Sequence, residues 1–336
     1  MIVDPMIRPP TIRAMTRPSA RKGEEIHCNA RWARVEPVLS VLVPVYKYDS
    51  TKLISALSEC EFAKQVELIL YDDGSDDAGL SEALKVGIDA FKGAGCVVTA
   101  AHNIGRSGGR NRLETLARSN WMLFLDSDMI PDDRLFLRRY MSLIEQYGQP
   151  ILVVGGFSLQ QAVKTSTNAL HWHQCAQSEC VPAEARQTNP GRYVFTSNVL
   201  VHKDIMAVVP FDHAFEGWGW EDVDWGLRAA RRFPVLHIDN TATHVGLDTA
   251  STLIRKYAQS GPNFWLVANR HPDALKQTGL YRIALILSYI PGRSLIKWIS
   301  NGLARLPVTL MPARLTLFFL KLFRASVYAE ARHVRS

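Results

Sequence analysis

Short apolar runs alternate with amphipathic segments along most of the chain. Residues 39–46, 66–71 and 121–125 are predominantly apolar, which is typical of strands buried on both faces of a sheet. Between the first two runs, Leu53, Ile54 and Leu57 follow helical spacing. Further elements are predicted near residues 79–101, 132–147, 151–159 and 234–239. This order predicts an α/β fold with a doubly wound, mostly parallel sheet.

The run at residues 121–125 ends in two carboxylates, Asp126 and Asp128. Residues i and i+2 of a strand point the same way, and ligands of open α/β sheets collect beyond the carboxyl ends of the strands. Two converging carboxylates need a cation, and Mg²⁺ or Mn²⁺ bound to a phosphate fits this requirement. The alternative is a turn that caps the next helix.

A second acidic strand end is followed by a glycine-rich helix start. Asp72 and Asp73 follow the run at residues 66–71, and residues 102–111 contain three glycines and Arg110. This loop can offer amide groups and Arg110 to a phosphate at a helix N-terminus, although a turn eased by glycine explains it equally well. It is not the dinucleotide fingerprint GxGxxG.

Aromatic and acidic residues are interleaved between residues 211 and 225. Aromatic rings stack on sugar faces and carboxylates bind sugar hydroxyls, so this segment is typical of a carbohydrate site. Asp222 lies at a predicted helix start, where it should stay ionised and could act as a base. The alternative is a capped helix with its tryptophans in the core.

Histidines offer a further metal ligand. His244 follows the last predicted strand and would complete a metal site if it reached the crevice of Asp128. The segment from His171 to Cys180 also contains imidazole and thiol groups, but their spacing fits no zinc pattern. We therefore predict a polar loop or helix there.

Length and composition indicate a globular protein. The 336 residues, 47% of them hydrophobic, allow one large or two small α/β domains. Five cysteines without a CxxC pair favour a reducing compartment, and no secretory signal is visible, so a cytoplasmic location is predicted. Residues 1–38 carry scattered arginine and proline and are predicted to be a flexible basic arm.

The net charge of +7 is unevenly distributed. Residues 39–280 hold 23 basic and 27 acidic residues, whereas residues 281–336 hold nine and one. A slightly acidic core argues against a nucleic-acid groove. Residues 271–336 are predicted to be a basic amphipathic tail, broken into short helices at Pro291, Pro307 and Pro312. Such a tail favours peripheral docking on an anionic membrane surface over simple packing on the domain.

Together the motifs resemble those of the inverting family 2 nucleotide-sugar glycosyltransferases of GT-A fold, with a C-terminal half similar to the galactosyltransferase and chondroitin-polymerase type. The resemblance covers residues 39–270, with a nucleotide-sugar half at 39–160 and an acceptor half at 161–270. It rests on Val-Pro-Val-Tyr46, Tyr-Asp-Asp73-Gly-Ser, Asn103-Ile-Gly with Gly-Arg110-Asn111, Leu-Asp126-Ser-Asp128 and Gly-Trp-Gly-Trp-Glu-Asp222-Val-Asp.

The resemblance implies a role for each matching position. The donor site would comprise Pro44 and Tyr46 beside the base, Asp73 at the uracil imide, Asp126 by the ribose and metal, and Asn103, Arg110 and Ser127. Asp128 would bind Mn²⁺ or Mg²⁺ with His244 as second ligand, although His237 is an open alternative. Trp218 and Glu221 would hold the acceptor, and Asp222 would be the catalytic base.

The implied activity is a hexosyl or N-acetylhexosaminyl transfer from a UDP-sugar to a glycan or lipid-linked acceptor, in polysaccharide or glycoconjugate assembly. The chain lacks the Gln-x-x-Arg-Trp motif and the membrane spans of polymerising relatives, which favours a single addition per encounter. A nucleotidyltransferase, or a carbohydrate-binding protein without catalysis, is the alternative.

Overall fold

A computed structural model describes residues 18–307 and 309–332. The strands are β1 Glu24–Cys28, β2 Leu39–Val45, β3 Val66–Asp72, β4 Ala94–Ala100, β5 Trp121–Leu125, β6 Met129–Pro131, β7 Leu152–Val154, β8 Phe157–Ser158, β9 Asn198–His202, β10 Val235–His237 and β11 Ala242–His244. The α-helices are α1 Thr51–Glu59, α2 Ala78–Ala90, α3 Gly105–Leu116, α4 Phe136–Gln146, α5 Ala169–Ser178, α6 Ala183–Gln187, α7 Lys203–Val208, α8 Glu221–Ala230, α9 Ala250–Gln259, α10 Gly261–Arg270, α11 Pro272–Leu275, α12 Gly279–Ser288, α13 Arg293–Ala304 and α14 Ala313–Ala331.

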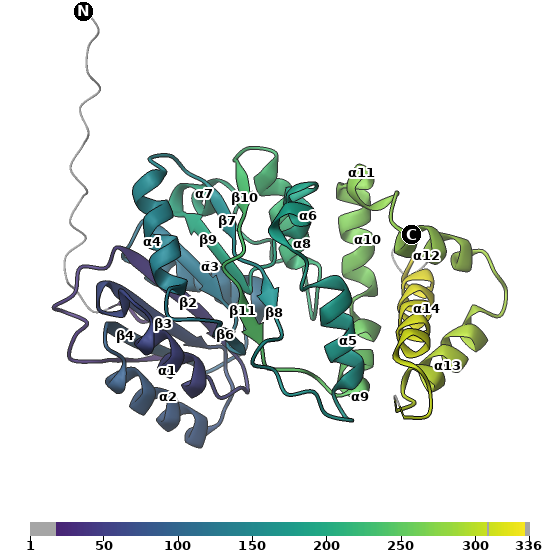
Figure 1. Cartoon of the computed structure of the whole chain (residues 1–336), viewed down its shortest axis with the longest axis horizontal. Helices are drawn as coiled ribbons and strands as arrows, with labels where there is room; N and C mark the ends of the chain where they lie inside the picture. Colours follow the sequence, from purple (N-terminus) through teal and green to yellow (C-terminus); the bar gives the residue numbers. More distant parts are fainter. Residues whose placement is uncertain (1–17, 308, 333–336) are drawn as a thin grey trace, which may run out of the picture.

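An eight-stranded sheet in the order β1-β4-β3-β2-β5-β9-β7-β10 forms the centre of the molecule (Figure 1). Neighbours among β4, β3, β2 and β5 run parallel, whereas β1 and β9 run antiparallel to their neighbours. A small sheet, β6-β11-β8, lies beside it. The predicted α/β fold with a mostly parallel sheet is confirmed.

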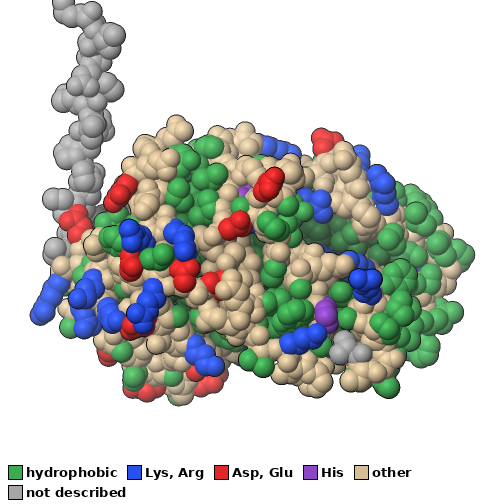
Figure 2. Space-filling model, in the orientation of Figure 1, with side chains coloured by type: hydrophobic (Ala, Val, Ile, Leu, Met, Phe, Trp, Pro, Cys, Tyr) green, Lys and Arg blue, Asp and Glu red, His purple; other side chains and the backbone are tan. Residues whose placement is uncertain are grey.

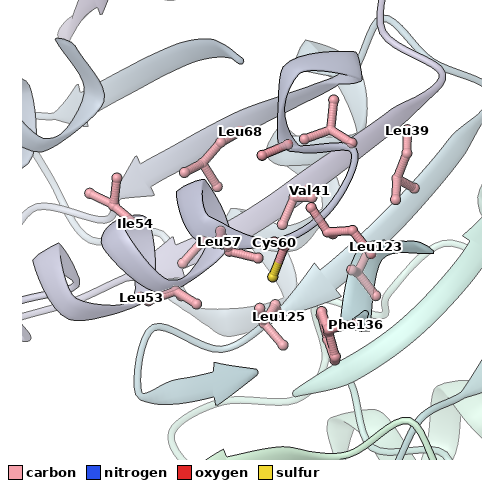
Figure 3. Close-up of a cluster of buried hydrophobic side chains, with 14 of the residues drawn as sticks. Leu39, Val41, Leu53, Ile54, Leu57, Cys60, Leu68, Leu123, Leu125 and Phe136 are labelled. Atoms are coloured by element: carbon pink, nitrogen blue, oxygen red, sulfur yellow. The ribbon is translucent and has the colours of Figure 1, made fainter. Parts of the chain in front are cut away.

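The parallel strands are apolar because helices cover both faces. Along β2, Val41 and Val43 contribute to one buried cluster and Leu42 to another. Figure 3 shows part of the first cluster, where Leu53 and Leu57 of α1 lie near strand residues. The carboxyl ends of β2, β3 and β5 are thus held at one edge of a rigid sheet, where side chains can form a site.

The single strand predicted at residues 151–159 is wrong, because Gly155 and Gly156 interrupt it. β7 pairs with β9 and β10 in the large sheet, whereas β8 pairs with β11 in the small one. Gly156 has φ +88°, and a Cβ atom on Gly155 would overlap the Tyr140 hydroxyl. The backbone needs glycine to turn in this crowded position.

The flexible arm predicted at residues 1–38 does not extend through residues 24–35. β1 pairs with β4 in this segment, Trp32 is buried, and Glu24 accepts a 2.6 Å bond from Arg112. A strand, a buried aromatic ring and a buried ion pair attach the segment to the large sheet and to α3. Residues 1–17 of the predicted arm lie outside the described residues.

The C-terminal helices α12, α13 and α14 break where proline was expected to break them. They lie at the end of the molecule away from β4 (Figure 1). The inner face of α14 is buried in a cluster with α9 and α10, through Leu320, Phe323 and Tyr328. This part of the predicted tail is therefore integral to the fold. Residues 308 and 333–336 of the predicted tail lie outside the described part of the chain.

Candidate active site

A cavity of about 740 Å³ opens at the carboxyl ends of β2, β3 and β5; we call it the strand-end cavity. Its lining contains every residue that the sequence assigned to the nucleotide-sugar: Pro44, Tyr46, Asp73, Asn103, Arg110, Asp126 and Ser127. Residues separated by more than 80 positions meet because parallel strands end at one edge of the sheet.

Asp73 organises the start of α3. Its two carboxylate oxygens accept hydrogen bonds from the amides of Ile104 (2.7 Å) and Gly105 (3.0 Å). Burial raises its pKa, although these two bonds oppose the shift. Asn103 also stabilises this turn, because its side-chain amide donates to the Asp73 backbone carbonyl over 2.9 Å. The helix N-terminus that could face a phosphate is therefore already capped by Asp73, and Arg110 lies within α3 rather than at its start.

Arg110 is a buried cation held between two carboxylates. Its side chain is 2% exposed, and its guanidinium lies 3.0 Å from Asp126 and 3.4 Å from Glu221. Ser197 also donates to Asp126 over 2.6 Å. Burial opposes ionisation of Asp126, but Arg110 and Arg106 outweigh it and hold the pKa below its usual range. Asp126 is therefore an ionised carboxylate with fixed orientation.

Asp128 and His244 face each other, as the metal hypothesis requires. Nε2 of His244 lies 3.3 Å from Oδ2 of Asp128. Two adjacent ligands of one octahedral Mg²⁺ ion, each at about 2.1 Å, lie roughly 3 Å apart. Burial lowers the pKa of His244, but the Asp128 and Glu179 carboxylates raise it overall to about 9, so a bound metal ion would replace a proton on this imidazole. This pair of oxygen and nitrogen donors fits Mn²⁺ or Mg²⁺ with phosphate and water as further ligands.

The backbone after β11 fits closely against the same carboxylate. The amide of Val245 donates to the Asp128 carbonyl over 3.0 Å. A Cβ atom on Gly246 would overlap the Asp128 carboxylate. Only glycine at position 246 lets this loop approach the pair of Asp128 and His244 without displacing it.

His237 is not at the site. In β10 it accepts from Arg186 at Nδ1 over 2.8 Å, and its Nε2 lies 3.0 Å from the carbonyl of Pro190. Both ring nitrogens are therefore engaged in the core of the fold. Of the two candidate histidines, only His244 faces Asp128.

His171 and Cys175 lie one turn apart on α5, and with His244 they form a compact group whose ligand atoms lie within 4.8 Å of one another. Burial and the Glu179 carboxylate raise the pKa of the Cys175 thiol far above its usual range. Nδ1 of His171 accepts from the amide of Asp248 over 2.7 Å. A protonated thiol and a hydrogen-bonded Nδ1 atom favour a packing role for these two side chains. The segment is a helix, one of the two structures predicted for it.

A sharp turn positions the first residues of α8. Gly217, Gly219 and Trp220 all have positive φ, between 72° and 89°. Trp220 tolerates this conformation because its indole donates to the Tyr328 hydroxyl over 3.0 Å. Strained backbone held by its surroundings is common at functional sites.

Asp222 does not stay fully ionised, contrary to the expectation from its helix position. Burial, followed by repulsion from Glu221, raises its pKa to about 7. One carboxylate oxygen accepts from the amide of Val223 over 2.8 Å. Burial and the neighbouring charge outweigh the helix N-terminus, and the resulting pKa suits a general base near neutral pH.

A second cavity of about 520 Å³, which we call the α8 cavity, adjoins the first at Asp126 and Asp128. Its lining includes the residues assigned to acceptor, base and metal: Trp218, Glu221, Asp222 and His244. Trp218 packs edge-on against Tyr257 with ring centres 5.2 Å apart. The structure thus brings the predicted donor residues and the predicted acceptor residues together where the two cavities meet, at Asp126 and Asp128; we call this place the joint.

Two arginines line the α8 cavity but were not predicted from the sequence. Arg106, one turn before Arg110, lies 3.5 Å from Glu221, and its position in the glycine-rich segment was an available signal. Arg324 of α14 lines the α8 cavity, where its guanidinium carbon lies 4.5 Å from the centre of the Tyr257 ring. No local pattern in the tail distinguishes Arg324 from its basic neighbours.

Comparison with known proteins places this geometry in context. Residues 40–197 match the model of the family described as Glycosyl transferase family 2. The match includes Asp73, Arg110, Asp126 and Asp128 and ends before α8. No curated protein matches the chain.

Solved structures extend the likeness over most of the chain. The structure described as "Mannosyltransferase PcManGT from Pyrobaculum calidifontis in complex with GDP-Man and Mn2+" has a TM-score of 0.56 and 13% identity, covering 89% of this chain and 88% of that one. The structure of S. aureus TarS 1-349 has a TM-score of 0.49 and 17% identity, covering 88% and 92%. The first likeness supports the fold, which is similar to that of GT-A glycosyltransferases.

Proposed function

We propose that the chain is a metal-dependent, inverting glycosyltransferase that moves a hexose or N-acetylhexosamine from a UDP-sugar to a hydroxyl group of a glycan. The observation that carries the proposal is the joint between the two cavities. Asp128 lines both cavities, and His244 and Asp222 line the α8 cavity beside it. The family 2 match over residues 40–197 supports the donor half.

The chain's own residues supply the positioning and the proton transfer. Asp128 and His244 would hold Mn²⁺ or Mg²⁺, which supplies charge neutralisation for a departing diphosphate. Asp222 would accept the proton of an incoming hydroxyl group, which then attacks the anomeric carbon from the face opposite the diphosphate and inverts it. Trp218 would stack on the acceptor sugar.

In the donor half, Pro44 and Tyr46 would flank the base, and Tyr46 is 49% exposed and therefore accessible to a ligand. Asp73 would accept from the uracil imide with the lone pairs that the α3 amides leave free. Arg110 and Asp126, fixed by their ion pair, would form the floor beneath ribose and phosphate.

The acceptor half rests on the resemblance of residues 217–224 to galactosyltransferases and chondroitin polymerases, which the family match does not reach. We propose a glycan acceptor, free or lipid-linked, used in polysaccharide or glycoconjugate assembly at the cytoplasmic face of a membrane.

A donor panel tests the proposal. The intact protein would be incubated with UDP-glucose, UDP-galactose, UDP-N-acetylglucosamine and GDP-mannose, and nucleoside diphosphate release would be measured with Mn²⁺, with Mg²⁺ and with a chelator. Release from a UDP-sugar that requires the metal supports the proposal. Pyrophosphate release from UTP and a sugar phosphate would instead indicate a nucleotidyltransferase, and binding without any release would indicate a carbohydrate-binding protein.

A further inference from the structure

Large apolar side chains are exposed in one concentrated region of the chain. Of the 18 large hydrophobic residues that are exposed in the described part, ten lie between positions 283 and 318. They are Ile283, Ile286, Tyr289, Ile290, Leu295, Trp298, Ile299, Leu310, Leu315 and Phe318, which we call the tail patch. Figure 2 shows hydrophobic side chains gathered at this end of the molecule. Scattered exposed apolar residues are normal, but a concentrated patch marks an interaction surface.

Most of the tail patch lies on helices whose opposite face is already buried, whereas Tyr289, Ile290 and Leu310 lie between these helices. In α12, Ala284 and Leu287 are buried in the cluster shared with α14, while Ile283 and Ile286 are exposed. Trp298 of α13 is 71% exposed. Each helix is therefore anchored to the fold on one side and presents apolar side chains on the other.

The charge around the tail patch is one-sided. Residues 281–336 hold nine basic residues and one acidic residue, Glu330; of the basic ones, Arg324 lines the α8 cavity and Lys297 is paired with Glu330 at 2.5 Å. Exposed basic side chains accompany the apolar ones on the same helices, at Arg282 on α12 and at Arg314 and Lys321 on α14. Apolar groups flanked by cations complement an anionic surface with an apolar interior.

We infer that the tail patch docks on the surface of a membrane that contains anionic lipid. Within residues 18–307 and 309–332, no helix is long and apolar enough to cross a bilayer. Short helices with an apolar face and basic flanks instead lie along the interface. A second copy of the chain fits less well, because a two-fold contact through this patch would place like charges opposite each other.

Docking would orient the α8 cavity toward lipid-borne acceptors. Arg324 of α14 lines that cavity, and its Nε donates to the Tyr328 hydroxyl over 2.9 Å. The same helix carries Leu315 and Phe318 of the tail patch. The helix α14 thus links the tail patch to the α8 cavity. A lipid-linked acceptor is therefore the substrate class that the docked enzyme would meet. This last step rests on the proposed glycosyl transfer.

Vesicle sedimentation of the full chain tests the docking. Vesicles would be of phosphatidylcholine alone, or with about a third phosphatidylglycerol to supply the negative surface potential. We expect binding to the anionic vesicles that weakens as KCl rises, because salt shortens the range of the attraction to about 8 Å at physiological ionic strength. Absence of binding to anionic vesicles would overturn the inference.

A double variant, Leu295→Gln with Trp298→Gln, tests the surface itself. Both side chains are at least 60% exposed, so the change should leave folding intact, as thermal unfolding can verify, while vesicle affinity falls at least tenfold. The control, Val86→Gln with Val163→Gln, replaces residues of similar exposure, 60% and 75%, outside the tail patch and should bind as the parent does. An equal loss of vesicle affinity in the double variant and the control, or no loss in the double variant, would overturn the assignment of the tail patch.

Two further measurements separate the possible failures. Sedimentation velocity without lipid should give the same monomer–oligomer distribution for parent and double variant; a dimer lost in the variant would assign the patch to self-association instead. Hydrolysis of the UDP-sugar in lipid-free solution should be unchanged in the variant. If the parent hydrolyses the UDP-sugar but does not bind vesicles, docking is wrong and the transferase proposal stands. If the parent binds vesicles but does not hydrolyse a UDP-sugar, docking is supported and the transferase proposal is not.

Discussion

The raised pKa of Asp222 makes its proposed role visible in the pH dependence of turnover. Burial and the Glu221 carboxylate raise this pKa to about 7. With that value, about a tenth of the side chain is ionised at pH 6 and about nine-tenths at pH 8. Because only the ionised form can accept a proton, turnover should rise about tenfold between these pH values.

Replacing Asp222 with Asn keeps the shape but removes the basic group. Turnover, measured as UDP release with acceptor present, should fall by about two to four orders of magnitude and lose its dependence on pH. UDP binding measured by calorimetry should barely change. The raised pKa of Asp222 stabilises the parent below about pH 4, and this contribution is lost as pH rises through 7. The variant should therefore be no less stable than the parent at pH 8.

Glu221→Gln provides the matched control for the electrostatics. Removing this neighbouring charge should lower the pKa of Asp222 and move the rise in turnover to lower pH. A parental turnover that is flat between pH 6 and 8, or an Asn variant with near-parental turnover, would refute the assignment of Asp222. Asp224 could not replace it, because that buried carboxylate is bound to Arg228, Arg270 and His271.

Three further substitutions test the donor half. Asp128→Ala should abolish the Mn²⁺-dependent part of UDP binding in calorimetry while leaving the fold intact, and unchanged affinity would reduce Asp128 to a turn residue. Gly246→Ala should weaken the same binding at least tenfold because its methyl group would displace the Asp128 carboxylate, whereas Gly148→Ala, which meets open space, should not. Arg110→Ala should lower the free energy of unfolding by about 3–5 kcal/mol in urea titrations, because it leaves Asp126 without its buried partner; a loss below 1 kcal/mol would contradict the geometry.

Local pattern was sufficient for much of the fold. The apolar runs at residues 39–46, 66–71 and 121–125 became β2, β3 and β5, because a strand buried on both faces must be apolar throughout. Pattern failed at residues 151–159, where β7 and β8 pair with strands of different sheets, because those partners lie far away in the chain. It also failed for residues 24–35, whose attachment depends on a strand partner some 70 residues away.

By itself, the sequence determined that three carboxylates reach the site: strand ends carry Asp73, Asp126 and Asp128, because chain direction in a parallel sheet places such ends together. Tertiary structure alone decided how those groups behave. It placed His244 rather than His237 beside Asp128, packed the backbone of Gly246 against the Asp128 carboxylate, and raised the pKa of Asp222. Distances and burial of this kind depend on elements far apart in the chain, and a local pattern contains no information about them.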